Sequence, residues 1–384
     1  MAELMRVVVV GAGVVGLLTA VECVRAGAQV ELVEQAPAIP STAAASYDRH
    51  RVVRALHRGN PALTRAAAGL HQGWLEIEQL LGRRFYHRTG VLTVGAPANL
   101  AADRVALAES GAPIETLLVD ELAERYPQVR FDCDDQAILE PDAGTVLADQ
   151  ALLAASWWLR GRPAVQIHQH TRVVKVTESR AVLLADGDVL GGDAVVVAAG
   201  PWSRSLLPRA LGAALTLKRQ TMLSYQPASL RPQWLRAPAI LGLGGSGRDA
   251  WLMPPVAGTP VRLSAASACR TVAELTDRDT PEQWREHLID RFSGQLTDFQ
   301  PAAVTGATEG YYLTDEAGQG PMLVQLGDEA VWAYAACGGM SFKFAPVLAR
   351  TLAALALGRT PAPTGLAPVD QPRRFAAVRR ELFI

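Results

Sequence analysis

A glycine-rich stretch near the start of the chain has the residue types and the spacing needed to bind phosphate groups. Residues 11–16 match the pattern G-x-G-x-x-G and follow a run of four valines at 7–10. A β-branched run of this kind indicates a strand buried on both faces, and the apolar residues after the motif indicate a helix. In such a turn Gly11 makes the sharp bend, Gly13 lets the backbone approach a pyrophosphate, and Gly16 lets the helix pack closely on the strand.

The helix that follows the glycines would hold the phosphates, because its first N–H groups are exposed and its dipole is positive at that end. A second strand, predicted over residues 29–33, ends on Glu34. The carboxylate of Glu34 can accept hydrogen bonds from a ribose 2′-OH, and its charge would repel a 2′-phosphate. The order of these elements predicts a dinucleotide site, for FAD or NAD: a strand, a turn, a helix, and a second strand that ends on an acidic residue. The alternative is a glycine turn with only a structural role.

The elements expected around this site form two parts. A second buried run, at residues 194–197, closes on Ala-Gly and predicts a strand of the same parallel sheet, so the nucleotide-binding part is discontinuous. We predict an α/β (α+β composite) fold, with a Rossmann-type domain and a mixed or antiparallel-sheet substrate domain. Ser46 predicts the cap of a helix over residues 46–56, and a second helix is predicted over 63–81. The predicted domain boundaries are 1–83, 148–212 and 318–384 for the nucleotide-binding domain, and 84–147 and 213–317 for the substrate domain.

Composition excludes several classes of function. The chain has 384 residues, 49% hydrophobic and 20% charged, with a formal net charge of -1, so it lacks the basic surface that binds nucleic acid or an anionic membrane. The apolar stretch at residues 7–21 is too short to span a membrane, and a strand begins too early for a signal peptide. The four cysteines are scattered, without metal-ligand spacing. We therefore expect no metal, reduced thiols and a cytoplasmic location.

Six stretches occur in an order that is similar to one family over nearly the whole chain. They are the glycine motif and residues 46–54, 89–92, 140–144, 199–202 and 339–344. Together they resemble the FAD-dependent D-amino-acid-oxidase superfamily, in the branch of monomeric sarcosine oxidase and N-methyltryptophan oxidase. The resemblance implies FAD rather than NAD, and oxidation of the C–N bond of a carboxylate-bearing amine by hydride transfer to flavin N5, which gives an imine. It also implies a small amine or amino acid as substrate, O2 or another electron acceptor, and a monomer.

Two cations are similar to the residues with which the family holds the substrate carboxylate. Residues 50–54, His-Arg-Val-Val-Arg, resemble the family's T-R-I-I-R, which points to Arg54 for the carboxylate and to Arg51 on the flavin side. Residues 341–344, Ser-Phe-Lys-Phe, resemble G-F-K-F, which points to Lys343 as the second partner. A guanidinium binds a carboxylate through two donors, and a lysine adds a point charge. The alternative for the two arginines is a solvated helix face.

Other candidate residues follow from the same resemblance. Lys343 stands at the start of a predicted apolar helix, where the dipole disfavours a cation, so an anionic ligand is expected nearby. The aromatic residues Tyr312, Trp251 and Tyr47 match or fall near pocket positions of the family, although each could equally belong to the core. The residues expected to bind the cofactor are Gly11, Gly13, Val14, Val15, Gly16, Glu34, Gln35, Arg51, Val174, Ala199, Gly200, Trp202, Gly338, Gly339, Met340, Ser341, Phe342 and Lys343.

Departures from the family bear on the chemistry. Members with covalent FAD carry a cysteine two residues before the equivalent of Tyr312, where this chain has Gly310, so we expect non-covalent FAD. Oxidases of this branch activate O2 with a lysine on a strand. The matching position here is Arg262, which keeps the charge but cannot give up its proton. The histidine that follows that lysine in sarcosine oxidases is replaced here by residues 265–267, Ala-Ala-Ser, which argues against sarcosine as the substrate.

Three other interpretations stay open at this point. One is an amino or imino acid dehydrogenase, or a biosynthetic tailoring enzyme, that reacts poorly with O2. Another is a flavin-bearing subunit whose substrate site is vestigial. The third is a dehydrogenase that uses NAD alone, which would be a colourless protein.

Overall fold

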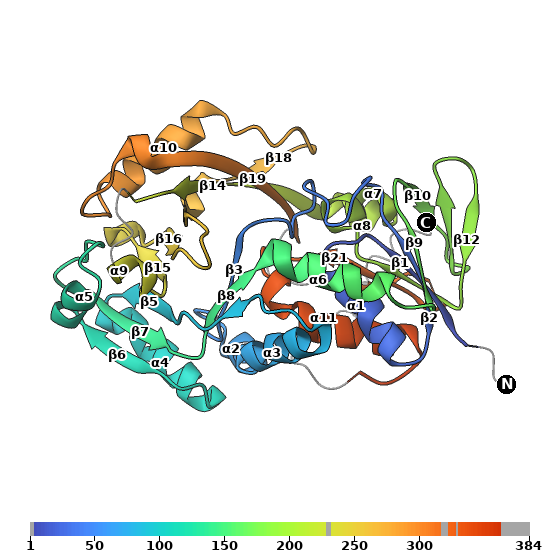
Figure 1. Cartoon of the computed structure of the whole chain (residues 1–384), viewed down its shortest axis with the longest axis horizontal. Helices are drawn as coiled ribbons and strands as arrows, with labels where there is room; N and C mark the ends of the chain where they lie inside the picture. The colour runs from blue at the N-terminus through green and yellow to red at the C-terminus, as the bar shows by residue number, and fades with distance from the viewer. Residues whose placement is uncertain (1–3, 228–231, 316–321, 328, 362–384) are drawn as a thin grey trace.

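The first sheet holds the glycine motif. The computed structural model describes residues 4–227, 232–315, 322–327 and 329–361. Within them a six-stranded sheet has the order β20-β21-β13-β1-β2-β9 and lies on the right of Figure 1. Strand β1 pairs in parallel with both β2 and β13, which confirms the predicted return of residues 194–197 to this sheet. The strands are β1 (Arg6–Val10), β2 (Gln29–Val33), β9 (Val165–His168), β13 (Ala194–Val197), β20 (Met322–Gln325) and β21 (Val331–Ala336).

Alternate valines of β1 face opposite sides of this sheet. Val7 and Val9 belong to a core with four helices, whereas Val8 and Val10 belong to a core with a three-stranded sheet and two short helices. Burial on both faces is the environment that the β-branched run predicts. The four helices are α1 (Val14–Arg25), α3 (Leu70–Leu81), α6 (Ala148–Arg160) and α11 (Ser341–Ala356). The elements on the other face are β10 (Val173–Val176), β11 (Ala181–Leu184), β12 (Val189–Gly191), α7 (Ser203–Leu206) and α8 (Arg209–Ala213).

The second sheet, at the other end of the molecule in Figure 1, has nine strands. Its order is β18-β14-β17-β16-β15-β5-β7-β6, with β19 also paired to β14. The sheet is mixed, because β5 and β15 are parallel while their other neighbours are antiparallel. Its strands are β5 (Val91–Gly95), β6 (Glu115–Leu118), β7 (Gln136–Glu140), β14 (Leu215–Tyr225), β15 (Ala239–Leu243), β16 (Ala250–Met253), β17 (Val261–Ala265), β18 (Cys269–Val272) and β19 (Val304–Asp315). Nearby helices are α4 (Pro97–Ser110), α5 (Val119–Arg125), α9 (Pro232–Leu235) and α10 (Glu282–Ser293).

A small sheet between the two large ones corrects a prediction. The helix expected over residues 46–56 is wrong: His50–Val53 is strand β3, and it pairs with β8 (Gly144–Leu147), which also pairs with β4 (Tyr86–His87). Two β-branched residues within β3 favour the strand once β8 offers a ladder. The helix expected over 63–81 is two helices, α2 (Pro61–Ala67) and α3. The side chain of Asn60 caps α2 by accepting the N–H of Leu63 at 2.9 Å.

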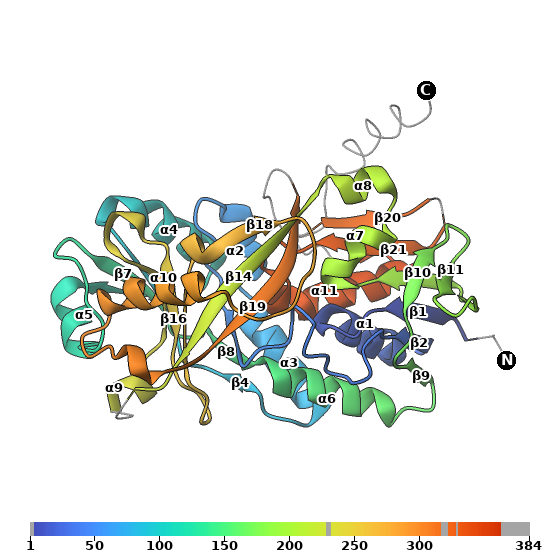
Figure 2. The same ribbon diagram turned by 90° about the horizontal axis from the view of Figure 1, so that it is seen from above.

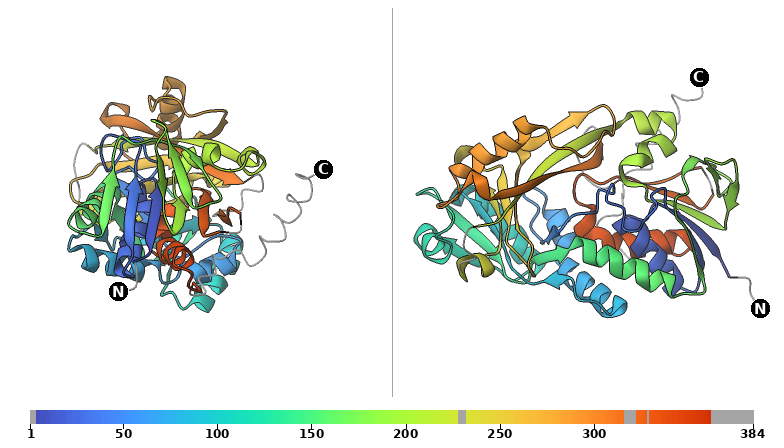
Figure 3. Two further views of the ribbon diagram at one scale, coloured as in Figure 1. Left: turned by 90° about the vertical axis from the view of Figure 1, so that its right-hand side faces the viewer. Right: turned by 45° about the horizontal axis from the view of Figure 1, so that its top comes forward.

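Two long strands connect the two halves of the molecule. Strands β14 and β19 pair along their full length, and in Figures 2 and 3 they extend from the second sheet toward the first. Leu217 of β14 belongs to the core of the first sheet, whereas Leu223 of the same strand belongs to the core of the second. The relative placement of the two sheets is therefore set by continuous strands. None of the helices in the described ranges is both long enough and apolar enough to cross a membrane.

Candidate functional site

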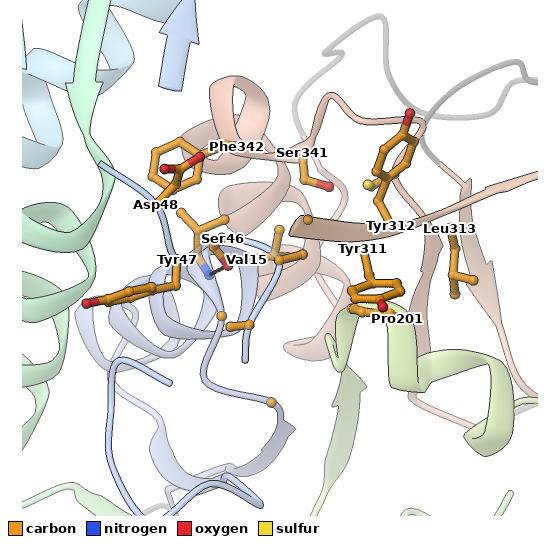
Figure 4. Close-up of a pocket in the computed structure, with 18 of the residues that line it drawn as sticks. Val15, Ser46, Tyr47, Asp48, Pro201, Tyr311, Tyr312, Leu313, Ser341 and Phe342 are labelled. Atoms are coloured by element: carbon orange, nitrogen blue, oxygen red, sulfur yellow. Dashed lines mark hydrogen bonds between the residues drawn. The ribbon is translucent and has the colours of Figure 1, made fainter. Parts of the chain in front are cut away.

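A cavity of about 890 Å³ lies where the first sheet, the start of α11 and one face of the second sheet meet. Figure 4 shows Ser46 near the start of α1, Phe342 at the start of α11, and Tyr312 of β19 around it. Every residue predicted for the site lines this cavity except Gly16, which is a buried residue in the first turn of α1. Ligand sites of small molecules and cofactors have volumes of this order.

The first glycine turn has the geometry that its spacing predicts. Gly11 has a φ of +100°, and a Cβ there would lie 2.7 Å from the carbonyl oxygen of Ala198, so this bend requires glycine. A Cβ on Gly16 would lie 1.8 Å from the carbonyl oxygen of Gly11, so Gly16 permits the contact of helix and strand. Gly13 is the N-cap of α1 and lines the cavity together with the first turn of that helix.

Glu34 follows β2, next to this turn. Its two carboxylate oxygens accept the N–H groups of Ala12 and Ala36, each at 2.8 Å, and its side chain is buried. These bonds fix the carboxylate on the wall of the cavity, beside Gln35. Each oxygen keeps a second acceptor site, so Glu34 can still accept a hydrogen bond from a ribose hydroxyl.

A second glycine turn precedes α11. Gly338 and Gly339 have φ values of +55° and +73°, and the N–H of Met340 donates to the carbonyl oxygen of Cys337 at 2.9 Å. The turn brings the first residues of α11, from Ser341 onward, to the wall of the cavity. An α-helix leaves its first N–H groups without partners inside the helix, so this end can bind an electron-rich edge of a ligand.

Arg54 and Lys343 are two cations on the wall of the same cavity. Within the described parts of the chain, neither side chain has a hydrogen bond or an ion pair. Burial lowers the pKa of Lys343 well below its ordinary value, and the charge of Arg54 lowers it further, while Glu140 opposes both effects. The buried carboxylate of Glu140 accepts the N–H of Ala55 at 2.7 Å. When Lys343 is protonated, two cations beside one carboxylate leave a net positive charge for an anionic ligand.

The backbone of Lys343 is held by packing around α11. The indole N–H of Trp74, a buried residue of α3, donates to the carbonyl oxygen of Lys343 at 3.1 Å. The ring of Trp74 stacks on Phe342 with centroids 5.2 Å apart, and His57 contacts Phe344 with centroids 5.4 Å apart. Burial and the two neighbouring cations lower the pKa of His57 to about 2, so its ring is neutral.

A buried ion-pair network fixes Arg262. Its side chain is 1% exposed, and its guanidinium lies 3.1 Å from the Asp48 carboxylate. The same guanidinium donates to the hydroxyls of Ser224 and Thr308, and Arg51 donates to the second oxygen of Asp48. Burial raises the pKa of Asp48, but the two guanidinium groups outweigh it and hold this pKa at about 2. The charge of Arg262 is thus compensated within the protein.

The three predicted aromatic residues lie at separate points of the cavity wall. Tyr312 is on β19, with its hydroxyl 3.2 Å from the Sγ of Cys269. Trp251 is on β16 and is half-buried. Tyr47 also packs against the core of the first sheet, and in Figure 4 its ring extends away from Tyr312. All three are thus accessible from the cavity, and Tyr47 contributes to the core as well.

The sequence model of the family described as FAD dependent oxidoreductase matches residues 6–355. The chain belongs to this family. The resemblance stated from the sequence is confirmed, and the interpretation as a dehydrogenase that uses NAD alone is wrong. The cofactor of this FAD dependent oxidoreductase is FAD, bound non-covalently as is typical for the family.

Curated relatives of this FAD dependent oxidoreductase include two sarcosine oxidases. The peroxisomal sarcosine oxidase of Homo sapiens is 26% identical over 226 residues, which are 56% of this chain and 55% of that protein. The monomeric sarcosine oxidase of Bacillus sp. (strain B-0618) is 25% identical over 209 residues, 53% of each chain. The matched region spans about half the length of these relatives.

Solved structures share the fold over nearly the whole length. NikD, described as an unusual amino acid oxidase essential for nikkomycin biosynthesis, superposes with a TM-score of 0.78 at 20% identity, over 93% of this chain and 94% of that chain. L-proline dehydrogenase from P. horikoshii gives a TM-score of 0.80 at 17% identity, over 98% and 99%. The predicted mixed α/β fold class is therefore confirmed.

The cavity fits FAD in its size and in its two glycine turns. The first turn, where a Cβ would meet backbone at Gly11, would hold the diphosphate with the first N–H groups of α1. Glu34 would bind the ribose. The second turn and the first residues of α11 would meet the flavin ring. The other predicted cofactor residues line the wall as well: Val174 on β10, and Ala199, Gly200 and Trp202 after β13.

Sequence reasoning assigned no role to two residues of the site. Asp48 was not assigned a role, although its position three residues before Arg51 could have suggested an ion pair. Its contact with Arg262 joins distant parts of the chain and left no local signal. Glu140 was recognised only as part of a motif, yet its carboxylate stabilises the charge of Arg54.

Proposed function

We propose that this protein oxidises the C–N bond of an amine that carries a carboxylate, an amino acid or an N-substituted amino acid, to an imine. The observation that carries the proposal is the pair Arg54 and Lys343, two cations without a described ion-pair partner in the cavity that also contains the first glycine turn. The names of the relatives and structural neighbours, among them sarcosine oxidase and amino acid oxidase, support it.

The two cations would orient the substrate. Arg54 can offer two parallel donors to a carboxylate, and Lys343 adds a point charge, so the amine would be held in one orientation. When bound, FAD accepts a hydride from the carbon next to the amine nitrogen. Binding the carboxylate would also neutralise the repulsion between the two cations, which adds to burial in lowering the pKa of Lys343.

The carboxylates on the described part of the cavity wall are already paired, so we propose that none acts as a general base. Glu34 accepts two backbone N–H groups, and Asp48 lies between two guanidinium groups. Glu309 accepts the hydroxyl of Thr221 at 2.7 Å and pairs with Arg219 at 3.1 Å. The amine would therefore bind after losing its proton to water. Loss of a hydride from this neutral amine leaves an iminium, which gives the imine when it releases a proton.

The test is carboxylate binding to the FAD-loaded protein, followed through the flavin absorbance. We expect Arg54→Met and Lys343→Met each to raise the Kd of a simple carboxylate by about 10- to 100-fold, the value of a hydrogen bond to a charged group. Arg350→Met is the matched control, because Arg350 is an exposed residue of α11 that pairs with Glu76. Arg54→Lys keeps the charge and checks that any loss is not misfolding. Unchanged Kd values in FAD-loaded Arg54→Met and Lys343→Met would overturn the proposal.

The state of Arg262 favours a second candidate, a dehydrogenase that uses an acceptor other than O2. Arg262 is buried, compensated by Asp48 and bound to two hydroxyls, and a guanidinium does not release its proton. We expect the reduced protein to be reoxidised slowly by air and rapidly by a soluble dye. Fast reoxidation by air that Arg262→Lys does not increase further would instead support an oxidase.

The organisation predicted from the sequence remains part of the proposal. All strands of the first sheet fall within residues 1–83, 148–212 and 318–384, and all strands of the second fall within 84–147 and 213–317, which supports these domain boundaries. All four cysteines are free thiols, which supports a reducing compartment such as the cytoplasm. We also propose that the protein acts as a monomer.

A further inference from the structure

The face of the second sheet that lines the cavity is divided into an apolar and a polar part. Directly paired residues of neighbouring strands point to the same face of a sheet. On this face Leu241 pairs with Trp251, and Met253 pairs with Arg262. We call the following four side chains, all of which line the cavity, the apolar wall: Met222, Leu241, Trp251 and Met253.

Side chains of the polar part make hydrogen bonds within the protein, while the buried Nε of Arg262 has no partner among the described residues. Arg262 donates to Ser224 and Thr308, and Gln220 donates to the carbonyl oxygen of Ala265 at 3.0 Å. The apolar wall carries few polar atoms: the indole N–H of Trp251 and two thioether sulfurs. A polar ligand group placed on this wall would therefore lose its hydrogen bonds to water and find few replacements.

The apolar wall lies near Arg54, one of the two cations proposed to hold the substrate carboxylate. Val52, two residues before Arg54, packs with Met222 and Leu241 against one apolar cluster, of which Met253 is a member. Val91 of that cluster pairs across the sheet with Glu140, the carboxylate that stabilises the charge of Arg54. A substrate held by Arg54 would thus bring the groups on its α-carbon toward this wall.

We propose that the substrate is an amino acid with a bulky apolar side chain, above all an aromatic ring, which packs on the apolar wall. This inference rests on the proposed function. An indole face and two flexible thioethers suit an aromatic ring, because sulfur–aromatic contacts and ring stacking both add to burial. A hydrogen or methyl group would leave the wall in water, and a polyol would desolvate its hydroxyls against it.

Equilibrium binding of carboxylates tests, without catalytic turnover, whether an apolar group packs on the apolar wall. The FAD-loaded protein is titrated with acetate, phenylacetate and gluconate, and the flavin absorbance reports each Kd. We expect phenylacetate to bind on the order of 100-fold more tightly than acetate, and gluconate no more tightly than acetate. Equal Kd values for acetate and phenylacetate, or tightest binding of gluconate, would overturn the inference.

Polar substitutions of similar size test whether the apolar wall causes the preference for phenylacetate over acetate. Leu241→Asn and Met222→Gln should each reduce the preference for phenylacetate over acetate by about tenfold or more, with the Kd of acetate unchanged. Leu118→Asn is the control, because Leu118 is 53% exposed on β6 of the same sheet and does not line the cavity. A preference that survives both wall substitutions would place the aromatic group elsewhere and contradict the inference.

Anaerobic flavin reduction separates this inference from the proposed function. The pairs are glycine with phenylalanine and sarcosine with N-methylphenylalanine, in both enantiomers where they exist. Faster reduction by the aromatic member of a pair supports both ideas. Faster reduction by the small member is consistent with the proposed function and contradicts the proposed role of the apolar wall. If no amine reduces the flavin, the proposed function fails, and the carboxylate titration still decides the role of the wall.

Discussion

Two influences disfavour the charged form of Lys343 and lower its pKa: its burial and the neighbouring charge of Arg54. A carboxylate ligand binds the protonated lysine, so affinity should be high below the depressed pKa and fall as the pH rises through it. We expect the Kd of phenylacetate to rise with pH well below the range in which ordinary lysines titrate, near 10.4. The measurement is a series of flavin-absorbance titrations at increasing pH. Lys343→Met should bind weakly and show a flat profile; a wild-type profile that is flat up to the ordinary lysine range would contradict the depressed pKa.

Asp48 is the carboxylate that pairs with the buried guanidinium of Arg262 and with the partly exposed guanidinium of Arg51. Its folded-state pKa of about 2 lies below the ordinary value, so its stabilising effect is present above about pH 4 and is lost as the pH falls toward 2. We expect Asp48→Asn to lower the free energy of unfolding at pH 7 by about 3 kcal/mol, because both cations lose their partner. Denaturant titration of the FAD-loaded protein measures this change.

The control for this prediction is Asp186→Asn, at an exposed aspartate in the turn between β11 and β12, which should change stability by less than about 0.5 kcal/mol. The difference between wild type and Asp48→Asn should shrink below pH 4. A difference that stays constant down to pH 2 would mean that the charge of Asp48 does not carry the effect.

Among the elements, α11 depends on α3 for the placement of its first turn. Trp74→Phe retains a ring to stack on Phe342 but removes the N–H that binds the carbonyl oxygen of Lys343. We expect a three- to tenfold higher Kd for phenylacetate, the value of about one hydrogen bond, with full FAD content. A shifted pH midpoint for binding would show that Trp74 acts through Lys343. The control is Trp158→Phe on α6, whose ring packs under the Arg162 guanidinium; an equal effect there would point to general loosening.

The local sequence pattern was enough to predict the first strand, turn and helix. The glycines, the valine run and Glu34 specify these elements within about one βαβ unit. The local pattern failed for residues 46–56, where Ser46 predicted a helix and the structure has β3. That strand exists because β8, far along the chain, supplies its hydrogen bonds. Register between distant strands leaves no local signal, so the ladder could not be predicted from residues 46–56 alone.

For the whole molecule, the cavity is framed by contacts between segments far apart in the sequence. Asp48 bonds across to Arg262, and His50 to Thr259, so the start of β3 and the residue Asp48 before it are tied to β17 and to the turn that precedes β17. Motifs and strand patterns predicted two sheets and a dinucleotide site at the first glycine turn. They could not predict which charges would meet, because that depends on how β14 and β19 join the two cores. The resemblance supplied Arg54 and Lys343, and the structure adds Glu140 as their neighbour.

The most direct test of the account compares amino acids with their carboxamides as anaerobic reductants of the bound flavin. The two differ only in the group that Arg54 and Lys343 are proposed to hold. We predict that at least one amino acid bleaches the flavin absorbance, and that its carboxamide does so about 100-fold or more slowly at equal concentration of the unprotonated amine. Equal rates for acid and amide, or no bleaching by any amino acid in the panel, would contradict the assignment of this cavity to a carboxylate-bearing amine.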